Sequence, residues 1–165
     1  MKSIKLFLLF FLSSVITSAF AADSLYHPRA NARVDIEKAI AKARAEKKHV
    51  LIQAGGNWCG WCIEFNRFVH ADQEMDSILS ASFIVYHLNY SPQNTNYEIF
   101  KQYGFPVRFG FPVFLVLNAD GQLIHTQNSS YLEAGKSYNA SKVKEFLLSW
   151  TPSVFDESKY SWMKK

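Results

Sequence analysis

The stretch from residue 50 to residue 62 reads Val-Leu-Ile-Gln-Ala-Gly-Gly-Asn-Trp-Cys-Gly-Trp-Cys, and it holds both cysteines of the chain. Its first three residues form an apolar run that predicts a buried strand, and Gly55 and Gly56 then interrupt regular structure. The apolar residues beyond Cys59 recur at the spacing of one helical face: Cys62, Phe65, Phe68 and Val69. The stretch therefore predicts a strand, a turn and a helix that begins at Cys59.

The two cysteines are separated by Gly60 and Trp61, and this spacing favours a redox couple. A disulfide that closes so short a loop removes little entropy from the unfolded chain, so it is a poor structural staple. At a helix start, unpaired backbone N–H groups and the positive end of the helix dipole favour the thiolate form of Cys59. We therefore expect Cys59 to be the nucleophile and Cys62, one turn further in, to be the resolving thiol.

The remaining sequence alternates helical and strand patterns. Helices are predicted at residues 32–48, 72–79, 96–103 and 143–150, strands at residues 83–88 and 113–117, and a turn at residues 120–121 followed by a return strand at residues 122–126. Residues 129–140 are predicted as loop. Strands separated by helices need crossover connections, so we expect an α/β fold of three layers. Its central mixed sheet has helices on both faces and an antiparallel hairpin at its edge.

The composition points to one packed domain. The chain has 165 residues, 48% of them apolar and 19% charged, which excludes a disordered or low-complexity protein. Two cysteines are too few for a disulfide-rich scaffold. The formal charge of +4 falls to +2 without Lys2 and Lys5, and no dense run of basic residues is present. We therefore expect no nucleic-acid partner.

Residues 1–21 have the layout of a secretory signal peptide. Lys2 and Lys5 precede an apolar run at residues 6–12, and Ala19-Phe20-Ala21 offers small residues before a cut after Ala21. A membrane anchor is the alternative, but the apolar run falls short of the roughly 20 residues that span a bilayer. We expect an exported, soluble protein, periplasmic or secreted, without stable membrane insertion after signal removal. Beyond the signal we expect an irregular segment at 22–32, a domain at 33–151 and a tail at 152–165.

Metal sites are the main alternative use of a C-x-x-C pair. Structural zinc needs four ligands, and the chain has no second such pair and no two histidines at ligand spacing. Copper could use the two cysteines with His125 or His87 as third ligand. We expect neither a metal nor another cofactor, and we interpret all five histidines as surface or strand residues with satisfied hydrogen bonds.

Two motifs together resemble the thioredoxin-like proteins, over roughly residues 33–150. The first is the stretch quoted above, and the second is Gly110-Phe111-Pro112-Val113-Phe114-Leu115 with Asn118-Ala119-Asp120-Gly121 after it. The pattern is similar to exported bacterial members, including the C-terminal domain of the transmembrane thiol:disulfide interchange protein. The resemblance implies a cis bond before Pro112, facing the cysteines, with Phe105-Pro106 as a competing site. It also implies that partner proteins contact the residues around the pair: Trp58, Gly60, Trp61, Phe111 and Pro112.

The chain departs from the family pattern at three places. Gln53 stands where many thioredoxins carry a buried aspartate, so Cys62 needs water or another base, and Glu64 is near in sequence. The intervening pair Gly60-Trp61 contains no histidine to stabilise a thiolate, which favours a reductant over a strong oxidant. Phe111 either narrows the substrate groove or packs on Trp58 or Trp61.

These observations predict an exported thiol–disulfide oxidoreductase that acts by dithiol–disulfide exchange, with a preference for the reductase direction. Its partners would be proteins with disulfides or thiols, and a further protein that recharges the cysteine pair. The alternative is a non-catalytic binding module on the same fold, which holds a protein partner or copper.

Overall fold

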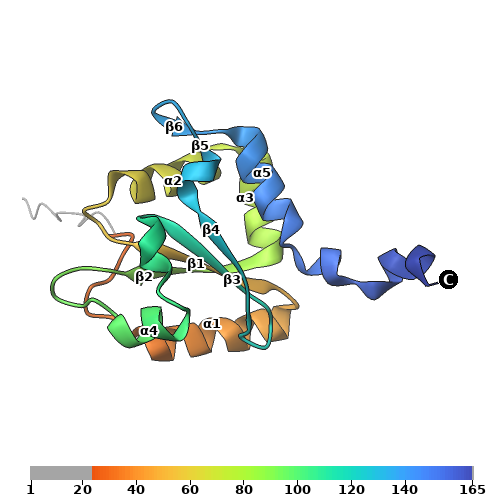
Figure 1. The fold of residues 1–165 in the computed structure, drawn as a ribbon, viewed down its shortest axis with the longest axis horizontal. Helices are drawn as coiled ribbons and strands as arrows, with labels where there is room; N and C mark the ends of the chain where they lie inside the picture. The colour runs from red at the N-terminus through yellow and green to blue at the C-terminus, as the bar shows by residue number, and fades with distance from the viewer. Residues whose placement is uncertain (1–23, 165) are drawn as a thin grey trace, which may run out of the picture.

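A four-stranded mixed sheet forms the centre of the molecule, in a computed structural model that describes residues 24–164 (Figure 1). The strands are β1 (His49–Gly55), β2 (Phe83–Asn89), β3 (Val113–Leu117) and β4 (Leu123–Asn128), in the order β2-β1-β3-β4. β1 pairs in parallel with β2, and the other two pairings are antiparallel. The predicted mixed sheet is confirmed, with β3 inside it and β4 alone at the hairpin edge. The predicted signal peptide lies outside the described residues.

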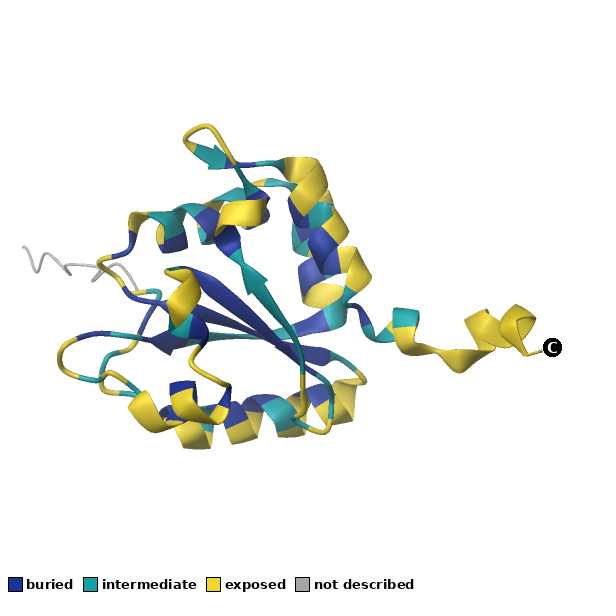
Figure 2. Ribbon diagram, viewed as in Figure 1, coloured by how far each residue is buried: buried dark blue, intermediate teal, exposed yellow. Residues whose placement is uncertain are grey.

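Helices cover both faces of the sheet, as predicted. One face carries α1 (Ala32–Glu46) and α4 (Tyr97–Gln102), and the other carries α2 (Gly60–Ala71), α3 (Gln73–Ser82) and α5 (Ala140–Ser149) (Figure 1). Two apolar clusters, one on each side of the sheet, form the core, and the helices turn their exposed faces outward (Figure 2). All seven residues of β1 are buried because helices cover both of its faces. Within the described residues, no helix is long and apolar enough to cross a bilayer.

Side-chain caps fix where the helices begin. Asn31, Asp72 and Asn139 each accept a hydrogen bond from a backbone N–H of the first turn of α1, α3 and α5. Such caps satisfy donors that the helix itself leaves unpaired. The N-cap of α2 is Cys59, and its sulfur accepts the Cys62 N–H at 3.1 Å. The capping pattern thus places the first cysteine at the very start of a helix.

Residues 129–140, predicted as loop, contain ordered structure. A 3₁₀ turn, η2 (Ser129–Leu132), leads into a hairpin of two short strands, β5 (Glu133–Ala134) and β6 (Ser137–Tyr138). The hairpin turns at Gly135, whose φ of 62° suits glycine. Strands of two residues are too short to show a periodic pattern, which is why the sequence did not reveal them. Contacts between β6 and α2 place this hairpin next to the cysteine helix.

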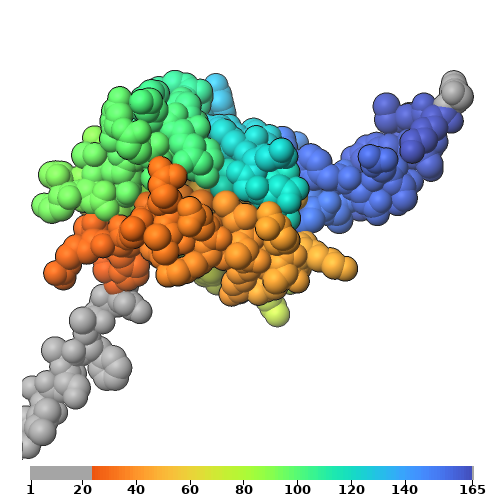
Figure 3. Space-filling view, turned by 90° about the horizontal axis from the view of Figure 1, so that it is seen from below, coloured from red at the N-terminus to blue at the C-terminus, as the bar shows by residue number. Residues whose placement is uncertain are grey.

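The C-terminal tail leaves the domain after Phe155, whose ring still packs edge-on against His49 at 5.5 Å. It consists of two 3₁₀ segments, η3 (Pro152–Phe155) and η4 (Glu157–Met163), joined to the end of α5. The chain points away from the body of the molecule in both views, and η4 has no buried residue (Figures 1 and 3). The tail lies at the opposite end of the molecule from the cysteine pair, so the site is built by the domain alone.

Candidate active site

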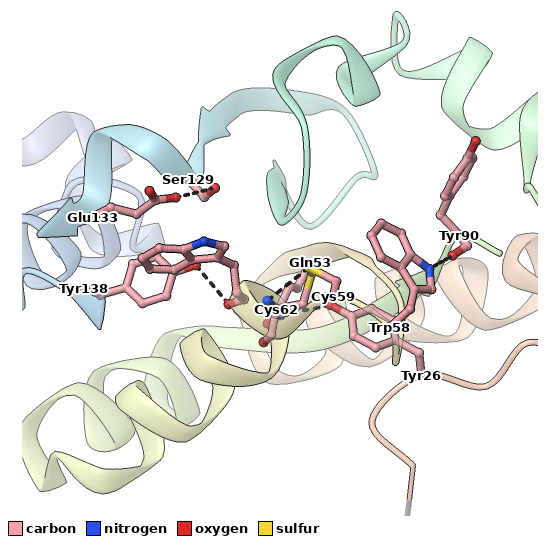
Figure 4. The surroundings of a disulfide bond; sticks show 10 residues. Tyr26, Gln53, Trp58, Cys59, Cys62, Tyr90, Ser129, Glu133 and Tyr138 are labelled. Atoms are coloured by element: carbon pink, nitrogen blue, oxygen red, sulfur yellow. Dashed lines mark hydrogen bonds between the residues drawn. A yellow bond between two sulfur atoms is a disulfide. The ribbon is translucent and has the colours of Figure 1, made fainter. Parts of the chain in front are cut away.

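A disulfide joins Cys59 and Cys62 at the start of α2 (Figure 4). The turn after β1 delivers Cys59, whose N–H donates to the Gly56 carbonyl at 3.0 Å. Cys62 follows one helical turn later, with the two Cα atoms 5.2 Å apart. Cys62 is fully buried, and Cys59 keeps 5% of its surface exposed. An incoming partner can therefore reach Cys59 but not Cys62.

Three aromatic side chains border the disulfide on its outer side, and we call Trp58, Tyr90 and Phe111 the aromatic rim. Trp58 is 58% exposed, and its indole N–H donates to the Tyr90 carbonyl at 2.7 Å. The Phe111 ring meets Trp58 edge-on at 5.6 Å and stacks on Tyr90 at 5.0 Å. These contacts hold an exposed apolar side chain in a fixed orientation next to the disulfide (Figure 4).

The Phe111–Pro112 peptide bond is cis, and it leads directly into β3. Phe111 packs against the cluster formed by Tyr26, Cys59 and Cys62, and Pro112 is buried. Of the alternatives for Phe111, the structure shows packing on Trp58. Pro106 instead starts the 3₁₀ segment η1 (Pro106–Phe109), which is an ordinary position for proline.

Gly60 and Trp61 lie on the other side of the disulfide, beside the β5–β6 hairpin. The Trp61 ring meets the Tyr138 ring edge-on at 5.4 Å, and the Tyr138 hydroxyl donates to the Trp61 carbonyl at 3.0 Å. Gly60 is exposed, and it lines a surface pocket with Trp61, Glu64 and Lys136. The hairpin that the sequence did not reveal therefore anchors one of the two residues between the cysteines.

Beneath Cys62 lies a group of polar side chains, the buried Tyr26 and Gln53 and the half-buried His87, which we call the polar floor. Tyr26 is fully buried, and the Gln53 side-chain amide donates to its hydroxyl at 2.9 Å. The same amide donates to the Cys62 carbonyl at 2.8 Å. Gln53 lies opposite His87 in the β1–β2 register, and the His87 ring meets Tyr26 edge-on at 5.4 Å. Three separate segments thus converge under the inner sulfur.

Asn57 fastens Tyr26 to the active-site turn. The Tyr26 N–H donates to the Asn57 side-chain oxygen at 3.0 Å, and the Asn57 amide donates back to the Tyr26 carbonyl at 2.8 Å. Tyr26 lies in the segment predicted to be irregular, and sequence reasoning missed it as a site residue. The available signal was that Leu25 and Tyr26 are the only large apolar residues of that polar segment.

His87 corrects the expectation that every histidine has satisfied hydrogen bonds. Its Nε2 atom is buried without a partner among the described residues. Burial, with smaller contributions from His70 and His27, lowers the pKa of His87 to about 4, so its ring is neutral near pH 7. Burial also raises the pKa of the Tyr26 phenol above its ordinary value, which keeps that hydroxyl protonated.

Glu64 is occupied by other partners. Arg67 binds its carboxylate at 2.7 Å, and the Ser137 hydroxyl donates to it as well. These hydrogen bonds lower the pKa of Glu64, so it stays ionised and bound to Arg67 and Ser137. The structure gives no sign that Glu64 serves Cys62 as a base.

The histidines considered for copper do not assemble with the cysteines into a ligand set. His125 stacks on Trp150 at 4.2 Å and hydrogen-bonds Gln127, and it lies on β4. Across residues 24–164, no three His, Cys, Asp or Glu side chains are grouped so that they could hold a metal ion. The site therefore offers two sulfurs, an aromatic rim and a polar floor.

Comparisons with known proteins agree with this geometry. Residues 30–119 match a protein family described as thioredoxin-like. A disulphide isomerase from Xylella fastidiosa Temecula1 is similar in structure, with 24% identity and a TM-score of 0.68 over 78% of this chain and 97% of that one. A thioredoxin from Thermus thermophilus is 23% identical, with a TM-score of 0.50 over 73% and 84% of the two chains.

A DsbH oxidoreductase is also similar, at 19% identity and a TM-score of 0.51, over 67% of this chain and 77% of that chain. A search of curated protein sequences gives no significant match. The family match covers more than half of the chain, and the solved structures share its sheet and flanking helices. The chain therefore belongs to the thioredoxin-like family and has its fold.

Proposed function

We propose that this protein is an exported thiol–disulfide oxidoreductase. The observation that carries the proposal is the position of Cys59, which caps α2 and is disulfide-bonded to the buried Cys62. A sulfur at a helix N-terminus is stabilised as a thiolate by backbone N–H groups, and here the Cys62 N–H already points at it at 3.1 Å. The two sulfurs thus differ in access and in electrostatic surroundings, which is what a two-step exchange requires.

The reduced protein acts on a partner disulfide in two displacements. The Cys59 thiolate attacks one sulfur of the partner, a bond forms between them, and the partner's other sulfur leaves as a thiolate. Cys62 then loses its proton to solvent and attacks Cys59, which re-forms the Cys59–Cys62 bond and releases the second partner thiolate. Two electrons pass from the protein to the partner, and both released thiolates take protons from solvent.

The rim and the segment at Pro112 form the contact surface for partner proteins. Trp58 offers an exposed ring beside Cys59, Gly60 leaves space, and Trp61 lies across from it, held by Tyr138. The Phe111 N–H and carbonyl can pair with an extended peptide as an added strand, whereas Pro112 has no N–H to offer. The partners would be proteins with exposed disulfides or thiols.

The residues between the cysteines favour the reductase direction. Neither Gly60 nor Trp61 carries a charge that stabilises the Cys59 thiolate further, as a histidine would. A reductase must itself be reduced after each cycle, so a second protein that supplies electrons belongs to the proposal. Export to the periplasm or outside the cell is supported by the pattern of residues 1–21.

Reduction of insulin disulfides by the purified protein, with dithiothreitol as electron source, tests the activity. Cys59→Ser should remove all turnover above the background of the reductant. Cys62→Ser should also remove turnover, but it should accumulate a mixed disulfide on Cys59 that mass spectrometry detects. Turnover unchanged in Cys59→Ser would overturn the proposal. Native protein that binds a partner without any exchange would instead support the binding module.

Equilibration in defined thiol buffers tests the direction. We expect a reduction potential of about −270 mV, where thioredoxin lies. A potential of about −120 mV, the region of the strong periplasmic oxidant, would make the protein a disulfide donor and contradict the reductase direction.

A further inference from the structure

After the mixed disulfide has formed, Cys62 must lose its proton to solvent and become an anion at a position that is buried in the oxidised protein. Its side chain is fully buried in the cluster with Tyr26 and Cys59, and the second displacement needs its thiolate. Burial without compensation disfavours a thiolate, while a hydrogen bond to the charged form favours it. The site therefore needs a donor close to the inner sulfur.

The Tyr26 hydroxyl and the Cys62 sulfur border the same small space. A methyl group placed on Gly55 would overlap the Cys62 sulfur and would lie 2.8 Å from the Tyr26 oxygen. Glycine at this position keeps the space between the two atoms open. Figure 4 shows the Tyr26 ring directed at the disulfide from the N-terminal segment.

Gln53 determines the direction of the Tyr26 hydroxyl proton. The Gln53 amide donates to the Tyr26 oxygen at 2.9 Å, so the phenol oxygen acts there as an acceptor. The Tyr26 hydroxyl proton must then point away from Gln53, because the Gln53 N–H already lies between the Gln53 nitrogen and the Tyr26 oxygen. Within residues 24–164, this oxygen makes no other hydrogen bond while the disulfide is intact. Its proton is therefore free for a new acceptor when the disulfide opens.

We propose that the Tyr26 hydroxyl donates a hydrogen bond to the Cys62 thiolate and so takes part in the exchange reaction. This inference rests on the proposed oxidoreductase function and assigns a role to a residue outside the cysteine motif. Tyr26 takes no proton in the step. Cys62 gives its proton to solvent, and the Tyr26 O–H stabilises the remaining negative charge until the bond to Cys59 forms.

The other titratable groups around Cys62 leave this role to Tyr26. From β1, the Gln53 amide already donates both of its N–H groups, one to the Tyr26 hydroxyl and one to the Cys62 carbonyl. From β2, the His87 ring is neutral near pH 7 and packs edge-on against Tyr26. From β6, the Tyr138 hydroxyl already donates to the Trp61 carbonyl. On α2 itself, Glu64 is bound by Arg67 and Ser137, and Cys59 is tied up in the mixed disulfide during this step.

The two displacements can be timed separately with Ellman's reagent, a chromophoric disulfide. The first equivalent of released thiolate reports the attack by Cys59, and the second reports the attack by Cys62 on the mixed disulfide. In Tyr26→Phe we expect the pH midpoint of the second phase to rise by about one unit, which slows it roughly tenfold below that midpoint. The first phase should keep its rate and midpoint.

Tyr103→Phe is the matched control, because it also removes a hydroxyl from a buried tyrosine but in the core on the opposite side of the sheet. It should leave both phases as in the native protein. If the second phase of Tyr26→Phe keeps the pH midpoint of the native protein, the inference is overturned and the oxidoreductase function still stands. Absence of any first phase in the native protein would overturn the function itself.

A measurement on the native protein avoids dependence on variants. In reduced protein labelled with ¹³C at tyrosine Cζ and cysteine Cβ, the Tyr26 resonance should titrate with the same midpoint as Cys62. A Tyr26 resonance that does not move through the Cys62 titration would contradict the hydrogen bond.

Discussion

The aromatic rim and the polar floor lie on opposite sides of one disulfide and have opposite character. The rim is apolar and partly exposed, with Trp58 at 58% exposure, whereas the floor is polar and buried, with Tyr26 at 0%. Two adjacent glycines separate them. A side chain on Gly55 would meet Cys62 and Tyr26, and one on Gly56 would meet Trp58 and the Tyr90 carbonyl. Changes in the floor should therefore alter stability and the inner sulfur, and changes in the rim should alter partner binding.

The largest effect on stability should come from His87 and should depend on pH. Its folded pKa of about 4 lies below the ordinary value of 6.5, so the unfolded chain binds more protons between these two values. Stability is complete above about pH 6.5 and falls by up to roughly 3 kcal/mol as the pH drops through 4. His87→Leu should remove this contribution, which urea unfolding at pH 7 and pH 4 would measure.

His125→Gln, on the edge strand β4, serves as the matched control for His87→Leu and should keep the native loss of stability at low pH. If His87→Leu and the native protein lose the same stability between pH 7 and pH 4, the neutral state of His87 does not contribute to the stability of the folded protein.

Gly55→Ala should have the next largest effect. The added methyl group overlaps the Cys62 sulfur and crowds the Tyr26 hydroxyl, and neither neighbour is the free end of a flexible chain. Overpacking of this kind costs about 1–3 kcal/mol. Thermal or urea unfolding of the oxidised protein measures it. Gly60→Ala is the control, because a methyl group there meets nothing within 4 Å, and its stability should match the native protein or exceed it. Equal stabilities of the two variants would contradict a tightly packed floor.

More of the aromatic rim than of the polar floor could be predicted from the sequence, because the residues of the floor are far apart along the chain. Strand, turn and helix around Cys59 follow from local patterns, and the cap at Asp72 and the strand at 113–117 were predicted in the same way. Within the rim, Trp58 adjoins the cysteines in sequence and was a natural candidate, whereas Tyr90 was not predicted. The Phe111–Pro112 segment was identified through the family resemblance.

The floor depends on contacts that leave no local trace. Tyr26 meets Gln53 across 27 positions and Asn57 across 31 positions, from a segment with no periodic pattern. β1 is buried on both faces, so the alternation that would show which side Gln53 faces is missing. The surroundings of His87 likewise include Tyr26, which lies far from it in sequence, and no single segment specifies that contact. The β5–β6 hairpin was not predicted because strands of two residues are too short to show a periodic pattern.

Trp58→Ala should give the smallest effect and the cleanest separation of rim from floor. Removal of the exposed ring takes away apolar contact with a partner but leaves the hydrogen bonds around Cys62 in place. An aromatic contact of this kind contributes about 1 kcal/mol, so we expect KM for insulin to rise roughly fivefold with kcat little changed.

In Trp58→Ala, both phases with Ellman's reagent, which is too small to span the rim, should keep their native rates. Trp58→Phe retains an aromatic ring but lacks the hydrogen bond to the Tyr90 carbonyl. Its KM for insulin should lie between those of the native protein and Trp58→Ala. If Trp58→Ala slows the small reagent as much as insulin, the rim supports the chemistry of the disulfide and not the recognition of its partner.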